Sequence, residues 1–187
     1  MATADELIQD ARDRMGKSVD HARTEFSTVR TGRASASLLD RIEVDYYGTP
    51  TPLKQLSTIN VPEPRMLTIQ PFDPGSIKAI EKAIMESDLG LQPSNDGKLI
   101  RLPIPQLTEE RRKELVKVVR SMAEEHRVAV RDIRRDAMKH LKDLVDSGEV
   151  GADEEHRGEL RVQELTDEHT KHIDELLKHK EAEVMEV

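Results

Sequence analysis

The sequence contains no cysteine and no tryptophan, and it has only two tyrosines and two phenylalanines among 187 residues. Without cysteine, the chain can form no disulfide, no thiol nucleophile and no cysteine-ligated metal site. With so few aromatic residues, its hydrophobic cores must be built from aliphatic side chains. No apolar run approaches the roughly 18 residues that a membrane span needs, and the charged segment around Asp5 and Asp10 is unlike a signal peptide. We therefore expect a cytoplasmic protein with no membrane association.

Proline is absent from residues 1–30 and 108–187, because all nine prolines lie between Pro50 and Pro105. This partition predicts a separate domain over residues 31–106, inserted between helical segments in 1–30 and 107–187. Short strand-like runs at 42–47, 56–61, 66–72 and 98–104 indicate strands. One helix is expected over about 74–87, with Ile77, Ile80 and Ile84 on its buried side, so the insert is expected to be a small α+β domain. Asn95-Asp96-Gly97 is typical of a tight turn before the last of these runs.

Outside the insert, the sequence predicts three helices: residues 3–29, residues 108–146, and a third that begins after Asp153. Each has one apolar stripe with steps of three and four residues, which must be buried against other elements. Thr108 is a suitable N-cap for the second helix, and Ser147-Gly148 is a suitable stop. The expected fold class is therefore α+β, an elongated three-helix bundle with an inserted β/α/β domain. Because each stripe can be buried within the bundle, we expect a monomer.

The net charge of −8 is unevenly distributed. Residues 148–187 hold 5 basic and 13 acidic side chains, a net charge of −8, whereas residues 108–147 hold 11 and 9, a net charge of +2. On a helical projection of residues 109–146 the cations share one arc, whereas most acids lie on another and only Glu109 and Glu124 intrude. The basic arc consists of Lys113, Lys117, Arg120, Arg127, Arg131, Arg134, Arg135 and Lys142. Cations separated from carboxylates suit a polyanion such as a nucleic-acid backbone, although a solvated helix face is the simpler alternative.

Other candidate sites are weaker. His169 and His172 have the i, i+3 spacing of metal ligands beside Glu168, but spacing fixes no third ligand. Gly97-Lys98 is followed by Leu99, whereas a phosphate-binding loop would have serine or threonine there. We therefore expect no catalytic residue, no metal and no cofactor. Tyr46-Tyr47 fits either a small interaction patch or strand packing.

Five segments together resemble bacterial ribosome recycling factors, in the order and spacing of that family. They are Ser27-Thr28-Val29-Arg30-Thr31-Gly32-Arg33-Ala34, Asp45-Tyr46-Tyr47-Gly48, Pro93-Ser94-Asn95-Asp96-Gly97, Ile104-Pro105-Gln106-Leu107-Thr108-Glu109-Glu110-Arg111-Arg112 and Val130-Arg131-Asp132-Ile133-Arg134-Arg135-Asp136. The resemblance implies an L-shaped molecule with a three-helix bundle and an insert after the first helix. It also implies a translation factor, not an enzyme, that binds the post-termination ribosome and splits the subunits with elongation factor G and GTP hydrolysis by that partner.

The same resemblance implies roles for individual residues. Arg131, Arg134 and Arg135 match the family's cluster that contacts large-subunit ribosomal RNA, and Arg120 and Arg127 join them on helical geometry. The family often has asparagine in place of Asp132, a difference expected to matter little because Asp132 projects onto the acidic arc. Two segments match the family's interdomain joints and are therefore the expected hinge. They are Arg30, Thr31 and Gly32, and Ile104, Pro105 and Gln106.

Two other functional classes remain open. A helical protein–protein adaptor would use a bundle stripe for its partner and would not bind ribosomes. A general RNA-binding module would bind free RNA as well as ribosomes, although the sequence lacks the series of aromatic residues on which single-stranded bases stack. An enzyme ranks last because no catalytic group of residues is evident.

Overall fold

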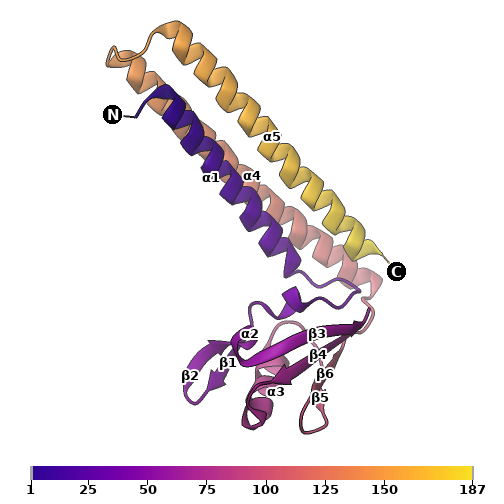
Figure 1. Ribbon diagram of the computed structural model, residues 1–187. Coiled ribbons are helices and arrows are strands. Elements are labelled where there is room, and N and C mark those ends of the chain that lie inside the picture. The colour runs from indigo at the N-terminus through magenta and orange to yellow at the C-terminus, as the bar shows by residue number, and fades with distance from the viewer. Residues whose placement is uncertain (1, 187) are drawn as a thin grey trace. The chain divides into compact units, whose positions relative to one another are not determined.

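The computed structural model describes residues 2–186 and divides the chain into two compact units. The first unit contains the chain up to Phe26 together with Lys117–Glu181, and the second contains Ser27–Val116 and the chain from Ala182 onward. The chain has three long helices and a small group of strands with one further helix of ten residues, α3 (Figure 1). The α+β class, with three long helices and an inserted strand-containing domain, is confirmed.

The long helices are α1 (Ala4–Ser27), α4 (Glu109–Asp146) and α5 (Ala152–Met185). The predicted caps of α4 are confirmed: Thr108 Oγ1 accepts a hydrogen bond from the Arg111 backbone at 3.1 Å, and Gly148 follows the helix with φ of +76°. Helix α1 ends at Ser27, two residues earlier than predicted.

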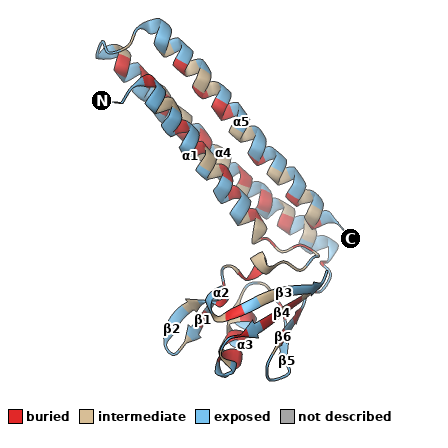
Figure 2. Cartoon of the chain, in the orientation of Figure 1, coloured by how far each residue is buried: buried red, intermediate tan, exposed pale blue. Residues whose placement is uncertain are grey.

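Buried positions form a stripe along each long helix (Figure 2). In the first unit the core is aliphatic except for Phe26, and it contains Met15, Val19, Phe26, Val119, Ala123, Val130, Ile133, Leu141, Val162, Leu165 and Ile173. Two polar contacts join α1 to α4 beside it: His126 Nε2 lies 2.7 Å from Glu25 Oε2, and Arg14 donates to Asp136 at 3.2 Å. Met122 lies at the edge of the stripe and is half-buried, whereas the neighbouring Ala123 is fully buried.

The second unit contains two antiparallel sheets. A hairpin pairs β1 (Glu43–Tyr46) with β2 (Thr49–Pro52), and four further strands form a sheet in the order β3-β4-β6-β5. Their bounds are β3 (Ser57–Glu63), β4 (Met66–Pro71), β5 (Ser94–Asn95) and β6 (Ile100–Pro103). Three short helices accompany them: η1 (Ala36–Leu39), α2 (Leu53–Leu56) and η2 (Pro74–Ser76), which leads into α3 (Ile77–Glu86).

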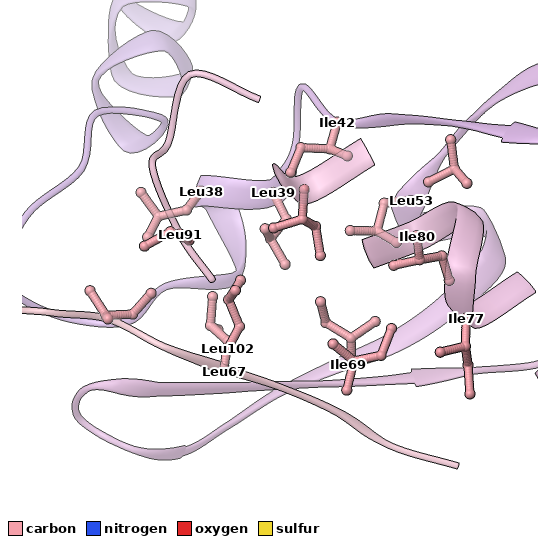
Figure 3. Packing of buried hydrophobic residues seen from close by; sticks show 14 residues of the cluster. Leu38, Leu39, Ile42, Leu53, Leu67, Ile69, Ile77, Ile80, Leu91 and Leu102 are labelled. Carbon is pink, nitrogen blue, oxygen red and sulfur yellow. The ribbon is translucent and has the colours of Figure 1, made fainter. Parts of the chain in front are cut away.

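The core of this unit is aliphatic throughout. One buried cluster contains Leu67 and Ile69 of β4, Leu102 of β6, and Ile77 and Ile80 of α3 (Figure 3). The predicted stripe of α3 is confirmed, because Ile77, Ile80 and Ile84 are its buried residues. Since a fully buried isoleucine or leucine contributes about 1.5–3 kcal/mol, this cluster can hold the unit together without aromatic residues.

Strand β2 was not predicted from the sequence. None of the predicted strand-like runs covers Thr49–Pro52, because a pair such as Thr49-Pro50 is a turn signal, yet this segment pairs with β1 in the register Tyr46↔Thr49 and Glu43↔Pro52. Proline has no N–H to donate, but it is tolerated in an edge strand, and a two-stranded hairpin consists of edge strands only.

Candidate nucleic-acid interface

Helix α4 carries all five arginines that were assigned to RNA. Its buried residues Val130, Ile133 and Ala137 face the bundle core, so the side chains between them point to the flanks and outward. We use the name arginine surface for Arg131, Arg134 and Arg135.

The three members of the arginine surface differ in how their guanidinium groups are held. Arg135 is the most open, with 78% of its side chain exposed and a 3.1 Å contact to Asp132. Arg131 is 45% exposed and donates to Glu124 at 2.9 Å. Arg134 is half-buried and donates to the neutral amide of Gln163 on α5 at 3.3 Å. Each guanidinium has five N–H donors, so one such contact leaves donors for an incoming phosphate.

Arg120 and Arg127 are engaged differently, because each bonds to a carboxylate of α5. Arg120 Nε donates to Glu181 at 2.6 Å, and Arg127 Nε donates to Asp174 at 2.7 Å. Only 21% of the Arg127 side chain is exposed. Burial opposes its charge, but its hydrogen bonds with Asp174 and Glu124 outweigh that effect and raise its pKa above the usual value. These two arginines join α4 to α5.

The predicted separation of cations from carboxylates is wrong. Helix α5 brings Asp174 and Glu181 to the basic side of α4. Glu124, which was expected to intrude there, binds both Arg127 and Arg131. Hydrogen bonds from Arg131 and Arg127 lower the pKa of Glu124, so this carboxylate stays ionised at neutral pH. Asp132 is also closer to the cluster than its projection suggested, since it bonds to Arg135. A projection of one helix cannot show the charges that a neighbouring helix supplies.

The residues predicted to form the hinge make hydrogen bonds inside the second unit. The guanidinium of Arg30 donates to the backbone carbonyls of Leu89 at 3.4 Å and Pro105 at 2.9 Å, so the two predicted segments are bonded to each other. Burial, followed by repulsion from Arg111, lowers the pKa of Arg30 from its usual value. Thr31 Oγ1 accepts from the Arg33 backbone at 3.2 Å.

The second predicted segment is also fastened. The Ile104 backbone N–H donates to the Arg65 carbonyl at 2.7 Å, and Ile104 is 2% exposed. The Gln106 amide faces Arg65, and with its oxygen turned toward the guanidinium it accepts two hydrogen bonds, each 2.8 Å long. Near the first segment, Gly32 lies beside the backbone of Glu186, whose carboxylate pairs with Arg33 at 2.5 Å.

Residues 2–186 contain no group of three or more His, Asp or Glu side chains that could hold a metal ion. His169, one of the candidate ligands, is half-buried with Nδ1 2.6 Å from the Leu165 carbonyl of its own helix. Within the same residues no helix is long and apolar enough to cross a membrane.

Gln163, Asp174 and Glu181 are the residues near the site that the sequence analysis did not identify. All three lie on α5, within the strongly acidic segment. That charge was the available signal: an acidic helix packed beside a basic one is expected to supply carboxylates to it.

Comparison with known proteins agrees with the motifs. Residues 22–185 match the family model described as ribosome recycling factor. The chain is 56% identical over 180 residues to a ribosome-recycling factor of Rubrobacter xylanophilus, covering 96% of this chain and 97% of that protein. It is 54% identical to one from Geobacillus kaustophilus, covering 98% of this chain and 100% of that protein.

Solved structures give the same result. The chain matches a solution structure of the ribosome recycling factor with a TM-score of 0.77 and 41% identity, covering 100% of both chains. It also matches, with a TM-score of 0.69 and 45% identity, a chain from models for the T. thermophilus ribosome recycling factor and the E. coli elongation factor G bound to the E. coli post-termination complex. That match covers 99% of this chain and 100% of the other. The chain therefore belongs to the ribosome recycling factor family.

Proposed function

We propose that this protein binds the post-termination ribosome and, with elongation factor G, separates the subunits so that they can be reused. Membership of the family supports this proposal, as does a related chain described together with elongation factor G on a post-termination complex. The protein would act in the cytoplasm as a monomeric binding factor, not as an enzyme, and the energy would come from GTP hydrolysis by its partner.

We propose further that the arginine surface anchors the protein to large-subunit ribosomal RNA. The observation that carries this proposal is that Arg131, Arg134 and Arg135 lie within two turns of one rigid helix and keep donors available. A guanidinium group can make paired hydrogen bonds to phosphate oxygens, and such contacts fix position without reading sequence. Arg120 and Arg127 would then support this surface through their bonds to α5.

The proposal includes two domains: a helical bundle of residues 1–30 and 107–187, and an insert of residues 31–106. The joint would consist of Arg30–Gly32 and Ile104–Gln106, where the chain leaves the bundle and returns to it. The bond from Arg30 to Pro105 supports treating the two segments as one joint, since it ties them together. The insert would be moved by the partner while the bundle stays anchored.

The first experiment is cosedimentation with purified large ribosomal subunits at two salt concentrations. Binding by wild type should be saturable and should fall with salt, because each phosphate contact releases counterions. The variant Arg131/Arg134/Arg135→Ala should lose binding and the salt dependence while keeping its helical circular-dichroism signal. A matched control, Arg12/Lys17/Arg23→Ala, removes the same charge from exposed positions of α1 and should bind normally.

Each contrary result points to a defined alternative. Equal binding by both variants would move the RNA contact away from the arginine surface. Equal affinity for ribosomes and for free RNA would favour a general RNA-binding module, and no ribosome binding at all would favour the adaptor. Subunit splitting, followed by light scattering with elongation factor G and GTP, tests the recycling step itself.

A further inference from the structure

The second unit contains an exposed aromatic group that the proposed RNA anchor does not use. Tyr46, Tyr47 and Phe72 are three of the four aromatic residues of the whole chain, and the fourth, Phe26, is buried in the bundle. Tyr47 is 82% exposed and Phe72 is 69% exposed. Large exposed apolar side chains on a protein so poor in aromatic residues indicate an interaction surface.

One carboxylate organises the two tyrosines. Asp73 Oδ2 accepts hydrogen bonds from the Tyr46 hydroxyl at 3.1 Å and the Tyr47 hydroxyl at 3.4 Å, while Oδ1 accepts from the Gly75 backbone at 2.9 Å. The two rings meet edge to face with their centroids 4.6 Å apart. The bond from Gly75, and then those from the tyrosines, lower the pKa of Asp73, so it is an anion at neutral pH. The result is an ordered pair of rings with a negative charge beside them.

Tyr47 has a backbone conformation that is unfavourable for a tyrosine. Tyr47 has φ of +49° and Gly48 has φ of +81°, and together they form the two-residue turn between β1 and β2. A turn with two positive φ values strongly prefers Asn-Gly, because most side chains clash in the left-handed region. A bulky tyrosine there, almost fully exposed, contributes little burial to the fold that would offset this cost.

The charges around the rings suit a cation. Asp73 is the carboxylate that bonds to both tyrosines. The two segments that supply the site, Glu43–Leu53 and Met66–Ile77, contain no Lys, Arg or His, although Arg65 and Lys78 flank the second segment. Lys54, next to the first segment, is paired with Asp40 at 2.5 Å. An RNA phosphate would be repelled by the Asp73 carboxylate, whereas a positively charged side chain would be attracted to it.

We propose that Tyr46, Tyr47 and Asp73 form a binding site for an arginine or lysine side chain presented by a partner protein. The cation would lie against the Tyr47 ring and bond to the Asp73 carboxylate, which combines a cation–π contact with a charged hydrogen bond. Arginine fits better than lysine, because its planar group can stack on a ring and donate to a carboxylate at the same time. The site is independent of the arginine surface, which belongs to the other compact unit.

The chain provides its own reporter for a test. It has no tryptophan, and its two tyrosines are both in the site, so tyrosine fluorescence and tyrosine ring NMR signals report on this site alone. The probe is the peptide acetyl-Gly-Arg-Gly-amide, titrated into the full-length protein. Matched probes are the same peptide with citrulline, which keeps the shape but not the charge, and a short single-stranded RNA.

The arginine peptide should shift the ring signals of Tyr47 saturably and bind roughly tenfold more tightly than the citrulline peptide. Asp73→Asn should abolish the difference in affinity between the arginine and citrulline peptides, while its side-chain oxygen still caps η2. Tyr47→Ala should reduce the peptide-induced shift of the Tyr46 ring signals. Asp96→Asn removes another exposed carboxylate of the same unit, one bonded to backbone N–H groups but not to an aromatic side chain, and should have no effect. Equal binding of both peptides, no saturable shift, or tighter binding of RNA than of the arginine peptide would overturn the proposal.

Discussion

Arg127 Nε donates to Asp174 Oδ1 across 2.7 Å and so joins α4 to α5 beside the arginine surface. The same guanidinium also donates to Glu124 at 3.0 Å, and Glu124 in turn accepts from Arg131. One hydrogen-bonded network therefore connects the Arg127–Asp174 bond, which joins α4 to α5, with Arg131 of the arginine surface. Within this region Arg127 serves to join the two helices, whereas Arg135 remains open to a partner.

The first prediction concerns stability. In a double-mutant cycle of Arg127→Gln and Asp174→Asn, we expect a coupling free energy of about 0.5–1 kcal/mol, typical of a partly exposed ion pair. Arg135→Ala, at a side chain that is 78% exposed, should change the free energy of unfolding by less than about 0.5 kcal/mol. Urea unfolding followed by circular dichroism measures both. A coupling of zero would mean that the Arg127 contact does not hold α5 to α4.

The second prediction concerns binding. Arg134 forms no salt bridge within residues 2–186, and its bond there is to the neutral Gln163, so little charge compensation has to be given up when a phosphate approaches. Arg134→Ala should weaken ribosome binding by about 1–3 kcal/mol, the range of a lost charged hydrogen bond. Arg134→Lys should recover part of the loss, because it restores charge but not the paired donors. Wild-type affinity in Arg134→Ala would remove this residue from the interface.

Much of the fold was predictable because local signals agreed. The spacing of Ile77, Ile80 and Ile84 predicted a buried face for α3, and Thr108 with Gly148 marked the ends of α4. Strand β2 was missed because its prolines indicate a break, and only pairing with β1 makes them acceptable at an edge.

The candidate site was less predictable for a different reason. The helical period of α4 identifies the side on which its arginines lie, but Asp174 and Glu181 reach them from a helix more than 40 residues later in the sequence. Which carboxylates of α5 meet the arginines of α4 depends on how the two helices are aligned. No periodicity within one helix contains that information.

The third prediction compares two glycines inside helices. Gly16 of α1 has open space where a Cβ would lie, whereas a Cβ on Gly158 of α5 would lie 3.1 Å from both methyl groups of the fully buried Leu141. Gly16→Ala should raise the free energy of unfolding by about 0.5–1 kcal/mol, because alanine favours the helix. In Gly158→Ala the same gain in the free energy of unfolding should be cancelled by overpacking against Leu141, which costs about 1–3 kcal/mol. Equal stabilisation in thermal unfolding would show that α4 and α5 can move apart without cost.

The fourth prediction is a pH dependence of the second unit. Backbone hydrogen bonds lower the pKa of Asp73, through Gly75, and of Asp96, through Leu99 and Lys98. A carboxylate whose pKa is depressed by folding stabilises the native state above its unfolded pKa, about 3.9, and loses that contribution as the pH falls through the folded value. The stability difference between wild type and Asp73/Asp96→Asn should therefore be constant above about pH 5 and shrink below about pH 4. Tyrosine fluorescence follows this unfolding, and a pH-independent difference would contradict the prediction.

The fifth prediction separates the fold of the β1–β2 turn from its proposed use. Tyr47→Asn places a residue that tolerates positive φ into the first position of the turn, which relieves a cost of about 1–2 kcal/mol. It also removes the 3.4 Å bond from Tyr47 to Asp73, a loss of about 0.5–1.5 kcal/mol. The variant should therefore be at least as stable as wild type, and it should bind the arginine peptide more weakly. Tyr47→Phe, which keeps the ring and the strain but loses the hydroxyl, should be slightly less stable than wild type. If Tyr47→Asn instead lowers the midpoint of thermal unfolding clearly, the tyrosine stabilises the hairpin, and its strained backbone is no longer an argument for a binding role.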